Sequence, residues 1–362
     1  MEKAIIHYGL VGFGGIAENR IAKEGFALDH TRFRDSLSID LIGVTDINQN
    51  RKAAVDALGL RWYDSIDKLL ARKMINAVYI ATSNSSHAEI AKKALLAGKH
   101  VMIEKPLATN LFEAEELAAL ARQLKLSIGI DHMMTKNQYN LKAKDMITSG
   151  SLGKIDHIVL HMEFFYGSTP EEAASWRCSR PEELGGPIGD VGTHCMYMAE
   201  FLLDDRIVSL QCTYTPQTMP IAVECGAHIR FTTAKGISGT IRIAFDQPGG
   251  SLENTIKNLG YEVYGEKGTL RSRGTLFQFS GYQDEPAAQS LEQEIDSSTK
   301  YHYIDDITNI YQAQIAEHAD SIRSKMLLDG EDALHNLKMV FACHTSAHEA
   351  GSLQQIPIKE DI

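Results

Sequence analysis

The sequence has few cysteines, no excess of basic residues and no long apolar run. Its five cysteines are scattered and none forms Cys-x-x-Cys, which predicts reduced thiols and a cytoplasmic protein rather than a disulfide framework or a redox motif. The formal net charge of −11 argues against nucleic acid or an anionic membrane as the partner. No apolar stretch is long enough for a membrane span, and the N-terminus lacks the apolar region of a signal peptide.

The 362 residues are 44% hydrophobic and 23% charged. This composition is typical of a globular protein with a sizeable core. Up to residue 130, short apolar runs alternate with helical segments, which predicts an α/β domain with a doubly wound parallel sheet. From residue 131 onward, longer strand-like runs with short turns predict an α+β domain with an open, mainly antiparallel sheet. We therefore expect a nucleotide-type α/β domain at 1–130 and an α+β domain at 131–362, whose final helices can pack back on the first. The acidic segment 283–300 is expected to be a mobile loop.

A glycine-rich turn follows the first predicted strand, residues 4–11, and precedes a helical segment that continues to about residue 26. Gly12 permits a tight turn, Gly14 lets the backbone approach a pyrophosphate, and the small Ala17 lets the helix pack closely on the strand. The N–H groups at the start of the helix would then hold the phosphates. The residues expected at the pyrophosphate are Gly12, Phe13, Gly14, Gly15 and Ile16.

The second predicted strand, residues 39–46, ends in an acidic residue. Asp46 would accept hydrogen bonds from the adenosine ribose and repel a 2′-phosphate, which favours NAD over NADP, with Ile47 beside the adenosine. Asp46 lies 34 positions after Gly12, so the polar residues 29–38 are expected to form a longer helix or loop. The alternative interpretation of Asp46 is the N-cap of the helical segment 48–58.

A second glycine-rich stretch runs from Gly185 to His194 and leads into the apolar helical segment 195–203. Asp190 and His194 are four positions apart, so on a helix a carboxylate and an imidazole would project from one face beside the turn. The alternative is a helix cap next to a surface histidine. Three such motifs now stand in order along the chain: the turn at 12–17, Glu-Lys-Pro at 104–106 and this stretch.

Together these motifs resemble the glucose–fructose oxidoreductase, inositol dehydrogenase and MocA-like superfamily of NAD(P)-dependent oxidoreductases. Further matches are Leu-Gly-Lys-Ile at 152–155, Trp-Arg at 176–177 and Tyr-Gly-Glu-Lys-Gly-Thr-Leu at 264–270. The resemblance implies a Rossmann domain, a C-terminal domain with a large open sheet, and a catalytic cleft between them. It also implies a homodimer or homotetramer through the open sheet face. The catalytic group that it implies is Lys105, Asp190 and His194.

Oxidation of a secondary alcohol requires loss of a hydride to the nicotinamide and of a proton to a base. His194 is the expected base, since an imidazole titrates near neutral pH. Lys105 would stabilise the developing alkoxide, and Asp190 would bind a neighbouring hydroxyl or hold the other two side chains. Lys105 as the acid–base group is the alternative.

The polar loop after the third predicted strand, residues 77–81, lies where ligands bind in open α/β sheets. Thr82, Asn84 and His87 are expected near the nicotinamide ribose, although His87 equally suits a helix cap, and Glu104 and Lys105 are expected at the ring. The substrate candidates lie elsewhere and are His132, Tyr166, Trp176 and Arg177. Relatives often carry an arginine just after the fifth strand, and its absence here weakens any transfer of their substrates. No metal is expected, because no further Cys or His stands at ligand spacing.

The expected activity is NAD-dependent oxidation of a sugar, glycoside or cyclic polyol, or the reverse reduction. One alternative uses transient oxidation at the same site for elimination or hydrolysis without net redox change. The other is a non-catalytic NAD sensor, which the presence of Lys105, Asp190 and His194 disfavours.

Overall fold

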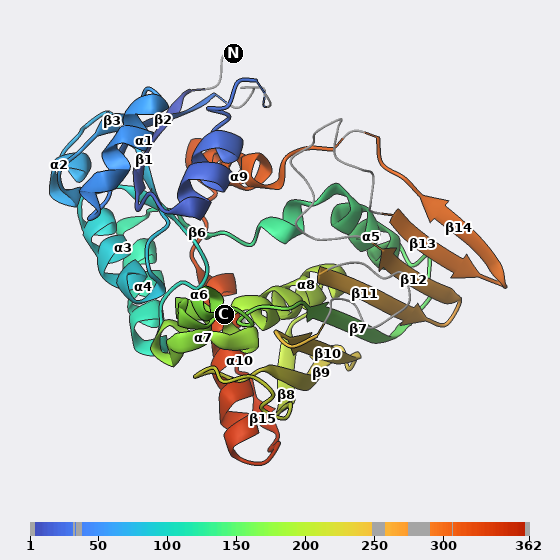
Figure 1. Cartoon of the computed structure of the whole chain (residues 1–362). Coiled ribbons are helices and arrows are strands. Elements are labelled where there is room, and N and C mark those ends of the chain that lie inside the picture. Colours follow the sequence, from blue (N-terminus) through green and yellow to red (C-terminus); the bar gives the residue numbers. More distant parts are fainter. Residues whose placement is uncertain are drawn as a thin grey trace. The chain divides into compact units, whose positions relative to one another are not determined.

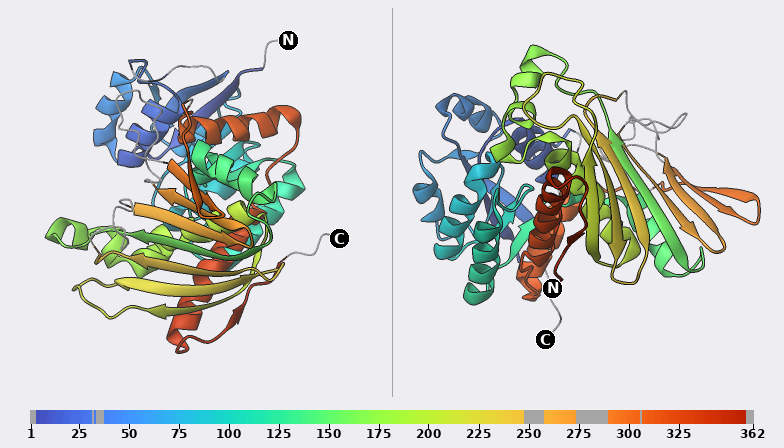
Figure 2. Two further views of the ribbon diagram at one scale, coloured as in Figure 1. Left: turned by 90° about the vertical axis from the view of Figure 1, so that its right-hand side faces the viewer. Right: turned by 90° about the horizontal axis from the view of Figure 1, so that it is seen from below.

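The computed structural model describes residues 4–31, 33, 38–247, 258–273, 290–305 and 307–358. The chain forms two compact units (Figures 1 and 2). Unit 1 comprises Met1–Met133 with Thr308–Leu334, and unit 2 comprises Met134–Ile307 with His335–Ile362. The chain therefore returns to unit 1 after most of unit 2 has been built. The predicted boundary between two independently folding domains at residue 130 stays a prediction.

The sheet of unit 1 has six strands in the order β3-β2-β1-β4-β5-β6, and every neighbouring pair is parallel. This is the strand order of a Rossmann fold, in which ligands bind beyond the carboxyl ends of the strands. The two-residue strand β3 was not expected from the sequence, because it carries no apolar run. The strands are β1 (Ile6–Val11), β2 (Ile39–Thr45), β3 (Arg61–Trp62), β4 (Ala77–Ile80), β5 (His100–Ile103) and β6 (Ile128–Ile130).

The helices of unit 1 follow the predicted alternation with strands. The long α4 begins where the Asn110 side chain accepts the N–H of Glu113 at 2.9 Å, and it ends at Lys125 in the left-handed conformation. Of the predicted insertion at 29–38, residues 32 and 34–37 lie outside the described residues. The helices are η1 (Ala17–Gly25, π-helical), η2 (Gln49–Arg51), α1 (Lys52–Ala57), α2 (Ile66–Leu70), η3 (Asn84–Ser86), α3 (His87–Leu96), α4 (Leu111–Leu124) and α9 (Ile310–Ser324), with η4 (Met133–Lys136) at the junction to unit 2.

The late helix α9 packs against η1 and β5 within unit 1, and it is the orange helix labelled in Figure 1. Its buried His318 bonds through Nδ1 to the hydroxyl of Tyr8 on β1, at 2.7 Å. Burial lowers the pKa of His318 to about 3, so the imidazole is neutral and suits an apolar core. The core of unit 1 is thus completed by a helix that follows most of unit 2 in the sequence.

The sheet of unit 2 has nine strands in the order β14-β13-β12-β11-β7-β10-β9-β8-β15. Only the β7–β10 pair is parallel, so the sheet is mixed and mainly antiparallel. The strands are β7 (Ile155–Glu163), β8 (Ile207–Tyr214), β9 (Gly226–Thr233), β10 (Ser238–Ala244), β11 (Asn258–Gly265), β12 (Gly268–Arg273), β13 (Ser290–Ile295), β14 (Ser298–His302) and β15 (Gln354–Gln355).

The expectation of a loop over 283–300 is wrong for its described part, which forms the hairpin of β13 and β14. Two of its acidic residues are paired, because Arg271 on β12 donates to the buried Glu292 at 2.9 Å and to Glu294 at 3.0 Å. These cross-strand ion pairs compensate the negative charge that made the segment resemble a loop. Residues 283–289 lie outside the described residues.

One face of the nine-stranded sheet is covered by helices, because α8 packs on β7 and α5 packs on β13 and on α8. Helix α8 is buried almost throughout, which accounts for the apolar run at 195–203. No helix among the described residues is long and apolar enough to cross a membrane. The helices of unit 2 are α5 (Gln138–Thr148), α6 (Pro170–Ala174), α7 (Trp176–Ser179), η5 (Pro181–Glu183), η6 (Ile188–Gly192, π-helical), α8 (Thr193–Leu203) and α10 (Glu331–His348), which begins in unit 1.

Candidate functional site

The glycine turn after β1 provides a cradle at the carboxyl edge of the sheet of unit 1. Gly12 has φ +87°, and a Cβ there would lie 2.5 Å from the carbonyl oxygen of Ala81. A Cβ built on Gly14 or Gly15 meets no atom within 4 Å, so both glycines border open space. A strand that ends in such a turn and a helix fits the diphosphate of a dinucleotide, since the backbone can approach it closely.

Replacing Gly12 by alanine is expected to lower the free energy of unfolding by about 3 kcal/mol and to abolish NADH binding, because backbone strain and a clash coincide there. Gly59 is a matched control, since its φ is +71° and its Cβ would meet nothing within 4 Å. Its replacement by alanine should cost only about 1 kcal/mol and leave NADH binding intact. Urea denaturation and NADH fluorescence titration measure both effects. Equal losses in the two variants would contradict the clash.

Asp46 lies just past β2 and faces the turn. Its Oδ2 accepts the N–H of Phe13, and its Oδ1 accepts the N–H of Asn48 at 2.7 Å. The side chain therefore fixes its own loop and also leaves lone pairs for ribose hydroxyls, because a carboxylate can accept about four hydrogen bonds. The alternative interpretation of Asp46 as the N-cap is wrong, because Asn48 caps η2 by accepting the N–H of Asn50.

Phe13 and Ile47 stand on either side of Asp46 in the structure's contacts: one is buried and bonded to it, and the other is exposed. The ring of Phe13 is buried and its N–H is held by Asp46, so Phe13 positions that carboxylate rather than offering a donor to a phosphate. The Ile47 side chain is fully exposed. Arg51, which the sequence reasoning missed, donates from Nε to the carbonyl of Phe13 at 2.6 Å and is paired with Glu18.

The loop after β4 carries Thr82 and Asn84, of which Asn84 is buried. His87 begins α3 and is completely buried, and its Nδ1 lies 2.8 Å from the carbonyl oxygen of Pro106. Its ring therefore supports the loop after β5 rather than facing a ribose, and Ser86 is the N-cap residue of α3. His87 therefore supports Pro106, the residue that directly follows Lys105.

Lys105 follows β5 at the same carboxyl edge as Gly12, is half-buried, and is joined to Pro106 by a cis peptide bond. Its neighbour Glu104 lies in a cluster with two buried residues of adjacent strands. The hydroxyl of Tyr79 donates to Asp131 Oδ2 at 2.7 Å and lies 3.4 Å from Glu104 Oε1. His132, a substrate candidate, directly follows Asp131 and is almost fully buried.

In unit 2 the stretch from Gly185 to His194 needs its glycines for close packing. A Cβ on Gly189 would lie 2.0 Å from the carbonyl oxygen of Leu184, and one on Gly192 would lie 2.8 Å from Ile243 Cδ1. The backbone here is a π-helical turn that widens before the α-helix begins at Thr193. The spacing of Asp190 and His194 is therefore set by a π turn, a feature often found at functional sites, rather than by the regular helix that we expected.

Asp190 is the centre of a polar and aromatic cluster. Arg177 Nε donates to Asp190 Oδ2 at 3.1 Å, and its guanidinium lies 4.6 Å from the ring centroid of Trp176. The same guanidinium lies 6.0 Å from the centroid of Tyr166. Burial tends to lower the pKa of Arg177, but Asp190 and Tyr166 outweigh it and the pKa is raised. Of the expected substrate residues, Arg177 thus contacts the expected catalytic residue Asp190, and Trp176 and Tyr166 lie beside the Arg177 guanidinium.

His194 is buried, and its Nδ1 lies 2.8 Å from the hydroxyl of Tyr197, one turn further along α8. The two rings are also in edge-to-face contact, with centroids 5.4 Å apart. This contact fixes the ring of His194 and directs its Nε2 to the opposite side. Tyr197 was not expected, although its i,i+3 spacing from His194 is the signal that indicates it.

The π turn is supported by a carboxyl group from the loop that precedes β9. Glu224 Oε1 accepts the N–H of Ile188 at 2.9 Å, and a Cβ on Gly186 would lie 2.5 Å from the same oxygen. Burial raises the pKa of Glu224 to about 7, although the hydrogen bond from Ile188 opposes this shift. Glu224 thus supports the start of the segment that carries Asp190.

The Glu224→Gln variant is expected to lose part of the pH dependence of stability. Between pH 4.5 and about 7 the folded protein keeps a proton that the unfolded chain has released, so stability falls as the pH rises through this window. The fall attributable to Glu224 is on the order of 2–3 kcal/mol. Urea denaturation of both proteins at pH 5 and pH 8 measures it. If both lose the same stability over this range, the protonation of Glu224 is not responsible.

Among the residues that the structure describes, no three His, Cys, Asp or Glu side chains gather as a metal ion requires.

The residues that sequence reasoning missed are Arg51, Tyr79, Asp131, Tyr197 and Glu224. All but Tyr197 are brought to their partners by strand pairing or by loops distant in sequence, and spacing carries no signal for such contacts.

Comparison with known proteins agrees with this arrangement. Residues 6–132 match the family model described as "Oxidoreductase family, NAD-binding Rossmann fold", and residues 140–271 match the "GFO/IDH/MocA C-terminal domain". The chain is 29% identical over 216 residues to 1,5-anhydro-D-fructose reductase from Ensifer adhaerens, which covers 59% of this chain and 62% of that protein. The match therefore spans less than two thirds of that relative.

Two solved structures show the same fold over nearly the whole chain. Levoglucosan dehydrogenase in complex with NADH and levoglucosan gives a TM-score of 0.81 at 19% identity, covering 98% of this chain and 100% of that one. A 3-ketoreductase from Actinomadura kijaniata in complex with NADP gives 0.77 at 22% identity, covering 94% and 98%. At these identities the likeness concerns the fold, and the two structures hold different nicotinamide cofactors.

Proposed function

Since this chain is a member of the GFO/IDH/MocA family of oxidoreductases with an NAD-binding Rossmann fold, we propose that it oxidises a secondary hydroxyl of a sugar, glycoside or cyclic polyol, or performs the reverse reduction. The observation that carries the proposal is that two features lie at the same edge of the sheet of unit 1. The open glycine cradle at Gly14 and Gly15 and the half-buried Lys105 both lie at the carboxyl ends of its strands. A phosphate cradle and a cation at this edge suit a nicotinamide cofactor and a reacting oxygen.

We propose NAD as the preferred cofactor. Asp46 would accept from the ribose hydroxyls and repel a 2′-phosphate. Arg51, which bonds to the glycine turn, is engaged with Glu18 and with the carbonyl of Phe13. Its charge is therefore compensated, and this weakens any attraction for a 2′-phosphate.

The Asp46→Asn variant is expected to lower the ratio of kcat/KM for NAD to kcat/KM for NADP by about 10- to 100-fold, since a hydrogen bond to a charged group is worth about 1.5–3 kcal/mol. Asparagine preserves the size of the side chain and can still accept the N–H of Phe13. Asp40→Asn on β2 is the control, because Asp40 pairs with His7 at the start of the strand. An unchanged ratio in Asp46→Asn would contradict the preference.

We propose that Lys105, Asp190 and His194 form the catalytic group. The cofactor supplies the hydride acceptor when bound. His194 takes the hydroxyl proton at Nε2 while Tyr197 holds Nδ1. Lys105 donates hydrogen bonds to the same oxygen and stabilises its developing charge. Asp190, held by Arg177, orients a neighbouring hydroxyl.

The cluster around Asp190 also supports a carbohydrate substrate. Trp176 and Tyr166 offer aromatic faces, and Arg177 and Asp190 offer donors and acceptors for vicinal hydroxyls. The names of the relatives, an anhydrofructose reductase and a levoglucosan dehydrogenase, point to the same chemical class. His132 remains a proposed contact from unit 1.

The test is incubation of the purified protein with NAD and a panel of aldoses, glycosides and inositols, following the absorbance of reduced cofactor. NADH with the corresponding ketones tests the reverse direction. Absence of turnover in both directions would count against a dehydrogenase. Product formation without accumulation of NADH would instead identify elimination or hydrolysis through transient oxidation. NADH binding without any turnover would favour a sensor.

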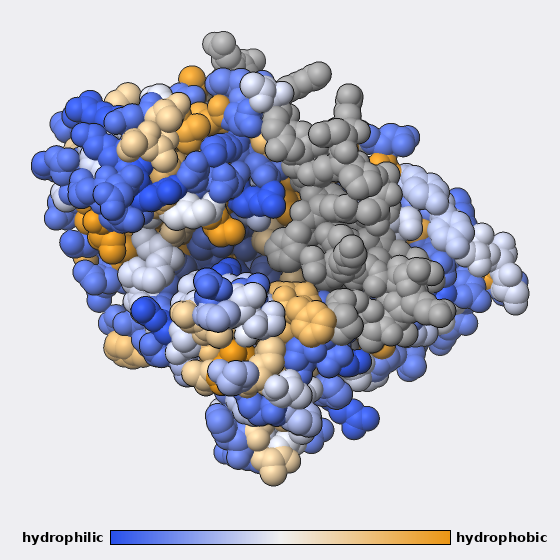
Figure 3. Space-filling view, viewed as in Figure 1, coloured by the Kyte–Doolittle hydropathy of each residue, from blue (hydrophilic) through white to orange (hydrophobic). Residues whose placement is uncertain are grey.

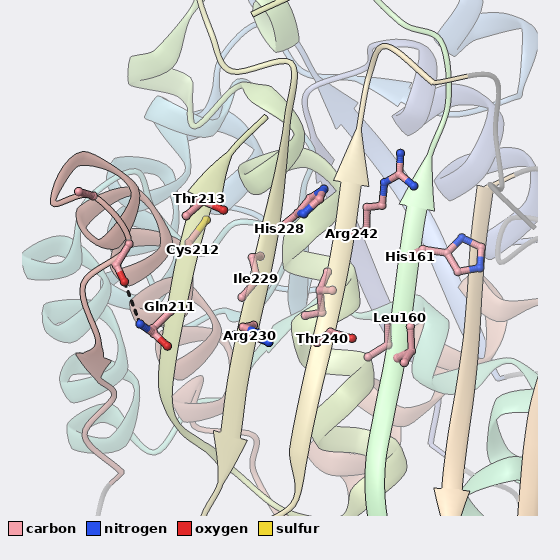
Figure 4. A pocket seen from close by; sticks show the side chains of 14 residues that line it. Leu160, His161, Gln211, Cys212, Thr213, His228, Ile229, Arg230, Thr240 and Arg242 are labelled. Atoms are coloured by element: carbon pink, nitrogen blue, oxygen red, sulfur yellow. Dashed lines mark hydrogen bonds between the residues drawn. The ribbon is translucent and has the colours of Figure 1, made fainter. Parts of the chain in front are cut away.

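We also propose a homodimer or homotetramer through the open face of the nine-stranded sheet. Figure 4 shows side chains of β7, β8, β9 and β10 around a shallow cavity of about 610 Å³ on this face. His161, Arg242 and His228 are aligned across β7, β10 and β9, and Arg242 is paired with the buried Glu163. Sedimentation velocity measures the assembly, and a monomer would contradict it.

We further propose a cytoplasmic location, which fits the five buried free thiols. Polar residues cover most of the described surface in Figure 3.

A further inference from the structure

Three ring side chains of unit 2 meet between helix α10 and strand β8. Figure 1 shows the red helix α10 beside this strand, and the hydroxyl of Ser346 accepts the N–H of Cys212 at 2.8 Å, which fixes the helix on the strand. The hydroxyl of Tyr214 on β8 lies 2.8 Å from Nδ1 of His344 and 3.5 Å from Nε2 of His348. One nitrogen of each imidazole is therefore directed at the same phenol oxygen.

The two histidines are four positions apart on α10, so they lie on one face of the helix. The ring of Tyr214 meets both rings edge to face, with centroids 6.1 Å from that of His344 and 5.6 Å from that of His348. His344 and Tyr214 are half-buried, while His348 is exposed. Packing thus holds one side of the cluster, and the other side is open to an ion from solution. The expectation of no metal did not take this His-x-x-x-His spacing into account.

The donor atoms of this cluster suit a transition metal. Two imidazoles at this helical spacing can bind one zinc ion, because adjacent turns direct both lone pairs to one point. Imidazole suits Zn²⁺, Cu²⁺ and Ni²⁺, whereas Mg²⁺ and Ca²⁺ take oxygen ligands. The carboxyl group that follows His348 is engaged elsewhere, since Glu349 accepts from Ser352 at 2.7 Å and from Gln354 at 3.0 Å. The set is therefore two nitrogens and one phenol oxygen, and it differs from the groups of three His, Cys, Asp or Glu side chains that the described residues lack.

We propose that His344, His348 and Tyr214 form a binding site for a divalent transition-metal ion, with Cu²⁺ bound more tightly than Zn²⁺, as the general affinity order of these ions requires. The phenol proton passes to solvent when the oxygen binds the ion. The bound ion joins α10 to β8 and so stabilises the folded state of unit 2. The site goes beyond the proposed function and does not depend on it, because none of its residues belongs to the proposed cofactor or substrate site.

The test is calorimetric titration of the purified full-length chain, freed of any affinity tag, with CuCl₂, ZnCl₂ or MgCl₂. Cu²⁺ and Zn²⁺ should each bind once per chain, and Mg²⁺ should not bind. His348→Ala should weaken Zn²⁺ binding by at least ten-fold, because loss of even an outer partner of a metal ligand costs about 10- to 100-fold. Tyr214→Phe should weaken it by about ten-fold, the lower end of that range.

His228→Ala is the matched control and should bind Zn²⁺ as the wild type does. His228 is exposed on β9 and pairs with Thr213, the neighbour of Tyr214, so its side chain lies on the opposite face of the sheet. Zn²⁺ should also raise the urea midpoint of the wild type and of His228→Ala, but not that of His348→Ala.

The exposed position of His348 allows its replacement without loss of the fold, which circular dichroism checks. Absence of Zn²⁺ and Cu²⁺ binding by the wild type would overturn the proposal. Unchanged affinity in His348→Ala would overturn it too, since the ion would then bind elsewhere on the surface. Mg²⁺ binding as tight as that of Zn²⁺ would contradict the class of ion, and wild-type affinity in Tyr214→Phe would remove the phenol oxygen from the site.

Discussion

Replacement of Lys105 by methionine is expected to lower kcat by a factor on the order of 10² to 10³, the range found when one donor to a developing oxyanion is removed. Methionine preserves the aliphatic stem, so the loop between β5 and α4 and the contact of His87 with Pro106 should persist. NADH should therefore still bind. Steady-state kinetics with the best substrate of the panel measures kcat, and fluorescence titration measures the Kd for NADH.

Lys92→Met is the matched control, because Lys92 is exposed on α3 and pairs with Glu116 at 3.2 Å. A surface pair of this kind contributes about 0–1 kcal/mol, so the control should show wild-type kinetics. A Lys105→Met enzyme with unchanged kcat would show that this lysine does not act on the reacting oxygen. Loss of NADH binding together with activity would indicate a role in the cofactor site instead.

The second large effect is expected at His194. Replacement by alanine should lower kcat/KM by about 10² to 10⁴, the usual contribution of a general base, and added imidazole should restore part of the activity. Tyr197→Phe is the graded control, because it removes only the hydrogen bond at Nδ1 and keeps the ring contact. Its loss should be much smaller than that of His194→Ala.

These variants also separate the two candidates for the acid–base group. If Lys105 takes the proton, a small amine should rescue Lys105→Ala, which leaves a cavity, and imidazole should not rescue His194→Ala. The double variant should be hardly slower than the worse single variant, because residues that act as a unit are not additive. Additive losses would indicate that Lys105 and His194 serve separate steps.

Local patterns in the sequence were enough to indicate the alternation of strands and helices, the glycine turn at Gly12 and the stretch around Asp190 and His194. These features depend on neighbours along the chain: a positive φ requires glycine, and buried parallel strands require apolar runs. The fold class and the family follow from such patterns, and both are confirmed. The positions of cofactor and substrate around these residues stay predictions.

Other features were decided only by the tertiary structure, because they depend on which distant residues meet. Register between β5 and β6 brings Glu104 to Asp131, and Arg177 reaches Asp190 across a turn. The π turn at Ile188–Gly192 and its support by Glu224 likewise require the folded chain. The sequence by itself determined most of the elements and the candidate catalytic side chains. Long-range packing determined the partners of these side chains, because such contacts join residues that are far apart in the chain.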